Sequence, residues 1–155
     1  MITIEELNKI RDSKRDLVMV RKVVMEQGEE LAKKTGYRKQ VLICGGTGCT
    51  SSGSKKVVSA LEAAISKNGL ESEVLIVKTG CFGLCALGPV MIVYPEGCFY
   101  SQVTPESVER IVEEHLKNGN IVKELLYKET VHDDGSIISL NETQFYKKQM
   151  RVALR

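Results

Sequence analysis

The feature that most constrains the fold of this chain is a set of four cysteines arranged as two short-spaced pairs. Cys44 and Cys49 form a C-x4-C pair, and Cys81 and Cys85 form a C-x3-C pair thirty-one residues later. Both pairs stand beside glycines, and glycine allows the positive φ angles and close backbone approach that wrapping an inorganic centre requires. We therefore expect a fold that brings two distant loops together so that the four thiolates converge.

The composition indicates the compartment in which these cysteines work. The chain of 155 residues carries 22 Lys and Arg against 20 Asp and Glu, a balance that does not indicate binding to nucleic acid or membranes. No apolar run approaches the roughly 18 residues of a membrane helix, and the charged first twenty residues do not resemble a secretory signal. Five cysteines, an odd number, then favour metal or redox chemistry over disulfides. We expect a soluble cytoplasmic protein.

Residues 1–36 are predicted to form a helical extension. Thr3 and Glu6 have the spacing of a capping box, and Gly36 is the expected stop. Gly28 costs about 1 kcal/mol relative to alanine inside a helix, so one long helix and two shorter helices both remain open. The apolar residues that recur along the extension are Ile4, Leu7, Ile10, Leu17, Val20, Val23, Val24 and Leu31.

Residues 37–119 alternate between short apolar runs and amphipathic patterns. These patterns predict strands at 40–44, 73–78, 90–94 and 98–103, and helices at 54–67 and 105–119. Thr104 followed by Pro105 has the chemistry of a helix start. The order β-α-β-β-β-α matches an α/β fold of the thioredoxin-like sandwich type, preceded by the N-terminal helical extension. Residues 120–155 show a weaker pattern and are predicted to be a linker or extension.

Several other kinds of site use cysteines. Structural disulfides conflict with the expected reducing compartment. Zinc sites usually carry a C-x2-C knuckle, and a thioredoxin-type dithiol requires C-x-x-C, but the sequence contains neither. The stretch from Gly48 to Gly53 has the glycine spacing of a phosphate-binding loop, but Ser54 stands where that loop needs lysine. A structural zinc module, a cluster-free assembly scaffold and a thiol oxidoreductase remain as alternatives.

A [2Fe–2S] cluster is the interpretation that the four cysteines favour. Such a centre is anionic, and the predicted helix 54–67 begins close to the first pair, where the positive end of its dipole stabilises negative charge. Backbone N–H groups of the 45–48 and 82–84 loops are expected to donate to the sulfurs and to tune the reduction potential.

Three stretches carry a resemblance to a known family: CGGTGC at 44–49, TGCFGLCALGP at 79–89 and YPEGCFYSQVTPESV at 94–108. Over roughly residues 37–127 the chain resembles the thioredoxin-like [2Fe–2S] ferredoxin domain. That domain forms the small iron–sulfur subunit of respiratory NADH dehydrogenase. It also occurs at the N-terminus of the flavin- and NAD-binding subunit of multimeric [FeFe] hydrogenases. The helical start of this chain is most similar to that subunit. The resemblance implies that the ligands are Cys44, Cys49, Cys81 and Cys85.

The same resemblance implies a one-electron carrier within a soluble NAD(P)-linked hydrogenase or a complex of the NADH dehydrogenase type. No substrate is expected to be converted on this chain. FMN and NAD(P) are expected only on a downstream flavin domain that this sequence lacks. The expected partners are that flavin domain and other iron–sulfur subunits, such as the hydrogenase catalytic subunit. A homo-oligomer is also possible, whereas no nucleic-acid partner or membrane insertion is indicated.

The fifth cysteine and the two histidines are interpreted as structural or solvent-exposed residues rather than as ligands. Cys98 matches no ligand position of the family and is expected to be a small core residue. His115 falls beside an apolar stripe, where a boundary histidine with satisfied hydrogen bonds is expected. His132, in an Asp-rich turn, is expected to be solvated. The sequence contains no recognisable acid–base pair or nucleophile with a base.

Overall fold

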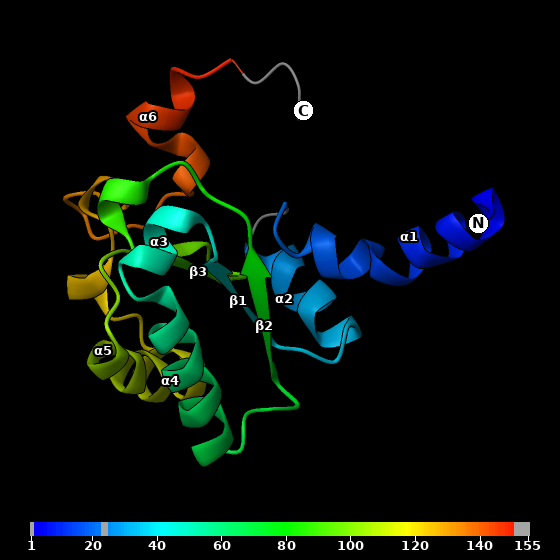
Figure 1. Ribbon diagram of the computed structural model, residues 1–155, viewed down its shortest axis with the longest axis horizontal. Coiled ribbons are helices and arrows are strands. Elements are labelled where there is room, and N and C mark those ends of the chain that lie inside the picture. The colour runs from blue at the N-terminus through cyan, green and yellow to red at the C-terminus, as the bar shows by residue number, and fades with distance from the viewer. Residues whose placement is uncertain (1, 23–24, 151–155) are drawn as a thin grey trace.

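A four-stranded sheet with the strand order β2-β1-β3-β4 forms the centre of the protein (Figure 1). The computed structural model describes residues 2–22 and 25–150. The strands are β1 (Lys39–Cys44), β2 (Val74–Thr79), β3 (Met91–Tyr94) and β4 (Cys98–Tyr100). β1 pairs in parallel with β2 and antiparallel with β3, which forms a hairpin with β4. The predicted α/β architecture is confirmed, although β4 ends at Tyr100 rather than at residue 103.

The sheet separates two hydrophobic cores because successive side chains of a strand point to opposite faces. In β1, Val41 and Ile43 belong to one core, whereas Leu42 and Cys44 belong to the other. The first, which we call the helix-side core, lies beneath the two main helices. The second, which we call the cysteine-side core, consists of Leu42, Cys44, Cys49, Val90, Ile92, Phe99 and Leu140.

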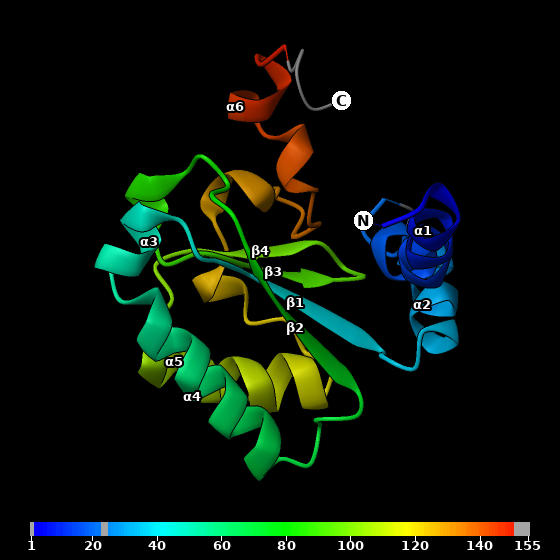
Figure 2. The same ribbon diagram turned by 45° about the vertical axis from the view of Figure 1, so that its right-hand side comes forward.

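Helices α4 (Ser54–Lys67) and α5 (Pro105–Arg110) cover the helix-side core (Figure 2). α4 has the predicted bounds, and its buried apolar side chains recur at helical spacing. These side chains are Val57, Leu61, Ala64 and Ile65. α5 starts at the predicted cap, where the Thr104 side chain accepts from the Ser107 N–H. The helix then continues as a π-helical segment, Ile111–Lys117, which the sequence pattern did not distinguish from an α-helix.

The N-terminal extension forms two helices, α1 (Ile4–Met19) and α2 (Met25–Lys34). The predicted capping box is present, because Thr3 and Glu6 bond reciprocally at the start of α1. Val23 and Val24 of the predicted apolar pattern lie outside the described residues. α1 buries none of its residues and projects from the body of the protein (Figure 1). Within the described ranges, no helix combines the length and the apolar character needed to cross a bilayer.

The chain beyond the closing helix returns to both cores. Val122 and Leu126 join the helix-side core, and the Val122 N–H donates to the Tyr100 hydroxyl at 3.3 Å. Leu140 joins the cysteine-side core on the opposite face of the sheet. The regular elements here are short 3-10 turns and one helical turn: Lys123–Leu125, Lys128–Thr130, Leu140–Glu142 and α6 (Gln144–Lys147). Residues 120–126 are therefore packed as part of the folded body.

Cys98 and His115 are both buried, and Cys98 is part of the helix-side core. Cys98 is 0% exposed, as expected of a core residue. His115 is also 0% exposed, and its Nδ1 bonds to the Tyr100 hydroxyl at 2.8 Å. Its Nε2 lies 3.7 Å from Glu96 Oε2, and neither atom has a hydrogen-bond partner among the described residues. Burial lowers the pKa of His115 to about 4. The prediction of a satisfied boundary histidine was therefore wrong.

Candidate metal centre

Two loops meet at one edge of the sheet because β1 and β2 are parallel and both end there. We call the loop that carries Cys44 and Cys49 the first cysteine loop, and the loop that carries Cys81 and Cys85 the second. Cys44 is the last residue of β1, and Cys81 follows the end of β2. Just beyond the strands, the Gly45 N–H donates to the Thr79 carbonyl oxygen at 2.9 Å. This bond continues the strand pairing and holds the first residues of the two loops side by side.

The second cysteine of each pair lies on a short helical turn. Cys49 belongs to α3 (Thr47–Ser51), and Cys85 opens the 3-10 turn Cys85–Leu87. The sequence predicted glycine-containing loops at both places and did not predict these short turns within them. Three to five residues are too few for an apolar period to appear in a sequence. These turns give Cys49 and Cys85 a hydrogen-bonded backbone rather than a free loop.

The thiols of the four cysteines influence one another. Burial raises the pKa of Cys49 to about 11, and hydrogen bonding with the Cys44 thiol adds to the rise. The Gly83 N–H, 3.2 Å from Cys81 Sγ, lowers the pKa of Cys81, and the Cys85 and Cys44 thiols act in the same direction. The Sγ atoms of Cys81 and Cys85 are 3.5 Å apart, and the Cys81 thiol raises the pKa of Cys85. The four side chains therefore form one electrostatically coupled group.

The two pairs differ in exposure. Cys44 and Cys49 are each 1% exposed and belong to the cysteine-side core. Cys81 and Cys85 are exposed to solvent. The site therefore has one side set into the protein and one side at the surface, a difference that the sequence spacing does not reveal.

Glycines of each loop pack against the cysteines of the other loop. A Cβ atom added to Gly46 would lie 2.8 Å from Cys81 Cβ, and one added to Gly48 would lie 3.1 Å from Cys85 Sγ. In the reverse direction, a Cβ atom on Gly88 would lie 2.8 Å from Cys49 Sγ. Any larger residue at these three positions would push a cysteine away. The glycines thus form a close-fitting backbone cradle, as expected where a chain wraps an inorganic centre.

The four thiols are the donor set that a [2Fe–2S] cluster requires. Among the described residues, no three His, Cys, Asp or Glu side chains gather closely enough around one point to hold a metal ion. A [2Fe–2S] cluster makes a different demand, because its four thiolates bind as two pairs on two irons. The chain supplies four thiols from two loops, and the glycine cradle leaves the space between the loops free of side chains at three positions. The residues present therefore fit such a cluster.

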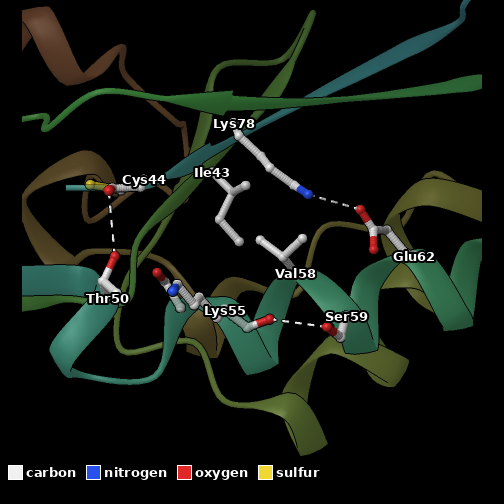
Figure 3. A pocket seen from close by; sticks show the side chains of 10 residues that line it. Ile43, Cys44, Thr50, Lys55, Val58, Ser59, Glu62 and Lys78 are labelled. Atoms are coloured by element: carbon white, nitrogen blue, oxygen red, sulfur yellow. Dashed lines mark hydrogen bonds and ion pairs between the residues drawn. The ribbon is translucent and has the colours of Figure 1, made fainter. Parts of the chain in front are cut away.

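A cavity of about 380 Å³ opens beside Cys44, between the end of β1 and the first turns of α4 (Figure 3). Ser54, the first residue of α4, lines this cavity together with Cys44. Across the cavity, Lys78 Nζ pairs with Glu62 Oε1 at 3.2 Å. Cys44 and the first residue of α4 therefore line one cavity, although the Cys44 side chain belongs to the cysteine-side core and α4 covers the helix-side core. Stabilisation of an anionic centre by the start of α4 stays a prediction.

Sequence reasoning missed one contact to the second cysteine loop. The Tyr146 hydroxyl, on α6, donates to the carbonyl oxygen of Phe82, between Cys81 and Cys85. The Tyr146 ring also packs against the cysteine-side core. Tyr146 is 64 positions from Phe82 and belongs to no motif, so no local sequence signal connects the two residues.

Comparisons with known proteins agree with this geometry. Residues 29–116 match the family model of the thioredoxin-like [2Fe-2S] ferredoxin. A 2Fe-2S ferredoxin of Clostridium pasteurianum is 46% identical over 77 residues, which are 50% of this chain and 76% of that protein. A putative 2Fe-2S ferredoxin of Priestia megaterium is 40% identical over 94 residues, which are 61% of this chain and 73% of that protein. The solved thioredoxin-like [2Fe-2S] ferredoxin of Aquifex aeolicus has a TM-score of 0.53 and 39% identity, and the match covers 57% of this chain and 88% of that one.

Proposed function

Because this chain belongs to the thioredoxin-like [2Fe–2S] ferredoxin family, we propose that Cys44, Cys49, Cys81 and Cys85 hold its [2Fe–2S] cluster and that the domain carries single electrons. The observation that supports this most is the convergence of the four thiols at one sheet edge inside a cradle of glycines. When bound, a cluster of this kind accepts and releases one electron at a time. No step of bond making or breaking in an organic substrate is assigned to the chain.

The two cysteine pairs are proposed to have different tasks. Cys44 and Cys49 fasten the site to the sheet and to α3, where the cysteine-side core excludes water. Cys81 and Cys85 lie at the surface, so a partner protein can approach this side closely. The Gly83 N–H donates to Cys81 Sγ and thereby stabilises negative charge on that sulfur. The site is thus buried enough to be protected and exposed enough to exchange electrons.

We further propose that the domain works in the cytoplasm as part of an NAD(P)-linked hydrogenase or NADH dehydrogenase-type complex. In that setting FMN and NAD(P) bind to a flavin domain, and the iron–sulfur subunits, including the hydrogenase catalytic subunit, exchange electrons with this domain. The projecting helix α1 supports the proposal of a protein partner, because three of its apolar side chains are largely exposed. These side chains are Ile4 at 78%, Leu7 at 53% and Ile10 at 52%.

The cluster and its ligands are tested by EPR spectroscopy of the dithionite-reduced protein, with iron and acid-labile sulfide measured on the same sample. Separate Cys→Ala substitutions are made at each of the five cysteines. We expect an S = 1/2 signal that is lost or altered at positions 44, 49, 81 and 85. The matched control is Cys98→Ala, which should keep the signal because Cys98 lies in the helix-side core. A protein that takes up zinc in place of iron would instead support a structural module.

The wider context needs its own experiment. NADH or NADPH is added with a purified FMN-containing dehydrogenase domain, and the visible absorption of the oxidised cluster is followed. We expect bleaching that depends on the flavoprotein and slows when residues 2–22 are deleted. A protein that holds the cluster but is never reduced in this way would contradict the NAD(P)-linked context and leave the electron-carrier proposal standing.

A further inference from the structure

One peptide unit of the second cysteine loop uses both of its polar groups at the site. It joins Phe82 to Gly83, between Cys81 and Cys85. Its N–H, which belongs to Gly83, donates to Cys81 Sγ at 3.2 Å. Its carbonyl oxygen, which belongs to Phe82, accepts from the Tyr146 hydroxyl. The phenol, the peptide and the thiol therefore form a continuous chain of hydrogen bonds.

Such a chain transmits polarisation because the peptide is a conjugated unit. A donor on the carbonyl oxygen draws electron density toward that oxygen and makes the N–H of the same peptide more positive. Linked hydrogen bonds strengthen one another in this way. A stronger N–H donor stabilises negative charge on the sulfur that it faces, and hydrogen bonds to sulfur are among the means by which proteins set the potential of iron–sulfur clusters.

We propose that Tyr146 is a positioning residue of the iron–sulfur site, acting through the Phe82–Gly83 peptide to strengthen the hydrogen bond on Cys81 and to raise the reduction potential. This inference rests on the proposed function, because it takes Cys81 to be a cluster ligand. The reduced cluster carries one more negative charge than the oxidised one, so a stronger donor stabilises the reduced form more.

The surrounding contacts hold the phenol in place. Leu140, 7% exposed, anchors the segment before α6 in the cysteine-side core. A reciprocal capping box between Ser139 and Glu142 orders the turn that follows. Thr143, 2% exposed, then leads directly into α6. Figure 1 shows this C-terminal segment passing over the side of the sheet where the loop after β2 emerges.

Tyr146 also lies outside the residues that match the family model. The family model ends at residue 116, thirty residues before Tyr146. The hydroxyl therefore adds a contact from outside the matched ferredoxin domain to a loop inside it. A segment beyond the domain can in this way adjust a cluster whose own ligand loops remain unchanged.

The test is Tyr146→Phe, which keeps the ring and removes only the hydroxyl donor. The matched control is Tyr127→Phe, because Tyr127 packs against the same core while its hydroxyl bonds to Glu129 Oε1 at 2.8 Å, away from the cysteine loop. In Tyr146→Phe we expect a midpoint potential shifted to more negative values. The iron–sulfur(Cys) stretching band in resonance Raman spectra should move to higher frequency. Tyr127→Phe should leave both unchanged.

A second measurement separates this inference from the proposed function. In the metal-free protein, the Gly83 amide proton signal should move upfield in Tyr146→Phe as its hydrogen bond weakens. The role of Tyr146 would be overturned by an unchanged potential and Raman band in the cluster-containing variant, together with an unchanged Gly83 signal in the metal-free variant. Failure of the wild-type protein to hold iron and sulfide would instead overturn the proposed function, whatever the Gly83 signal does.

Discussion

The two cysteine pairs occupy the same sheet edge but differ in their surroundings. Cys44 and Cys49 are 1% exposed, and their backbones belong to β1 and α3. Cys81 and Cys85 are exposed and belong to a loop and a single 3-10 turn. The position of the buried pair is fixed by β1 and α3, whereas that of the exposed pair depends on contacts from other segments.

The difference in exposure means that the buried pair is protected from water, whereas the exposed pair is open to hydrogen bonds from other segments. The buried pair faces the cysteine-side core, where burial raises the pKa of Cys49 and a backbone hydrogen bond from Val90 acts in the opposite direction. The exposed pair receives the Gly83 N–H and, through the same peptide, the influence of the Tyr146 hydroxyl. In the proposed iron–sulfur site, one pair is therefore held by the core and the other receives hydrogen bonds from its own loop and from α6.

The largest expected difference between the pairs is chemical reactivity in the metal-free protein. The pKa of Cys49 is raised to about 11, whereas that of Cys81 is lowered from 9.0. Only thiolates react with iodoacetamide, so at pH 8 we expect Cys81 to be alkylated about 100-fold faster than Cys49, or more. Both alkylation rates should rise with pH, and the rate at Cys49 should rise at higher pH than the rate at Cys81 because its pKa is higher. Mass spectrometry of timed samples measures the rates.

Denaturant provides the control for this experiment. Unfolding removes the burial of Cys49 and the hydrogen bond on Cys81, so the two rates should converge. Equal rates in the folded protein would contradict the distinction between a buried and an exposed pair.

A smaller difference is expected in folding stability, tested with the same substitution on each side. Leu42 lies in β1 two positions before Cys44 and is 6% exposed, so Leu42→Ala should lower the free energy of unfolding by about 3 kcal/mol. Leu84 lies in the second cysteine loop and is only partly buried, so Leu84→Ala should cost about 1 kcal/mol. Urea unfolding of the metal-free variants gives both values. Similar losses would mean that the exposed pair is fixed as firmly as the buried one.

The smallest effect concerns the glycine that links the pairs. Gly88 lies near Cys85, and an added Cβ atom would lie 2.8 Å from Cys49 Sγ. Such overpacking costs about 1–3 kcal/mol, so Gly88→Ala should lower cluster occupancy about tenfold under limiting iron. Gly80→Ala is the matched control, because a Cβ atom there meets nothing within 4 Å. Iron and sulfide contents measure the outcome, and equal contents in the two variants would show that the cradle tolerates a methyl group.

Local patterns account for the parts of the fold that the sequence predicted well. The apolar period of α4 extends over several turns, and its bounds were predicted to the residue. Thr3 forms the predicted capping box with Glu6, and Thr104 forms the predicted N-cap before Pro105. The short turns that carry Cys49 and Cys85 were missed because segments of five and three residues are too short to show a helical repeat of apolar residues.

By itself, the sequence determined the spacing of the four cysteines, the neighbouring glycines and the order of strands and helices, because each of these is set by residues close together in the chain. Only the tertiary structure decided which cysteine pair is buried, that His115 lies inside the core, and that Tyr146 reaches Phe82. These features depend on packing between distant segments. No local pattern encodes them, since burial and long-range hydrogen bonds exist only once the whole chain has folded.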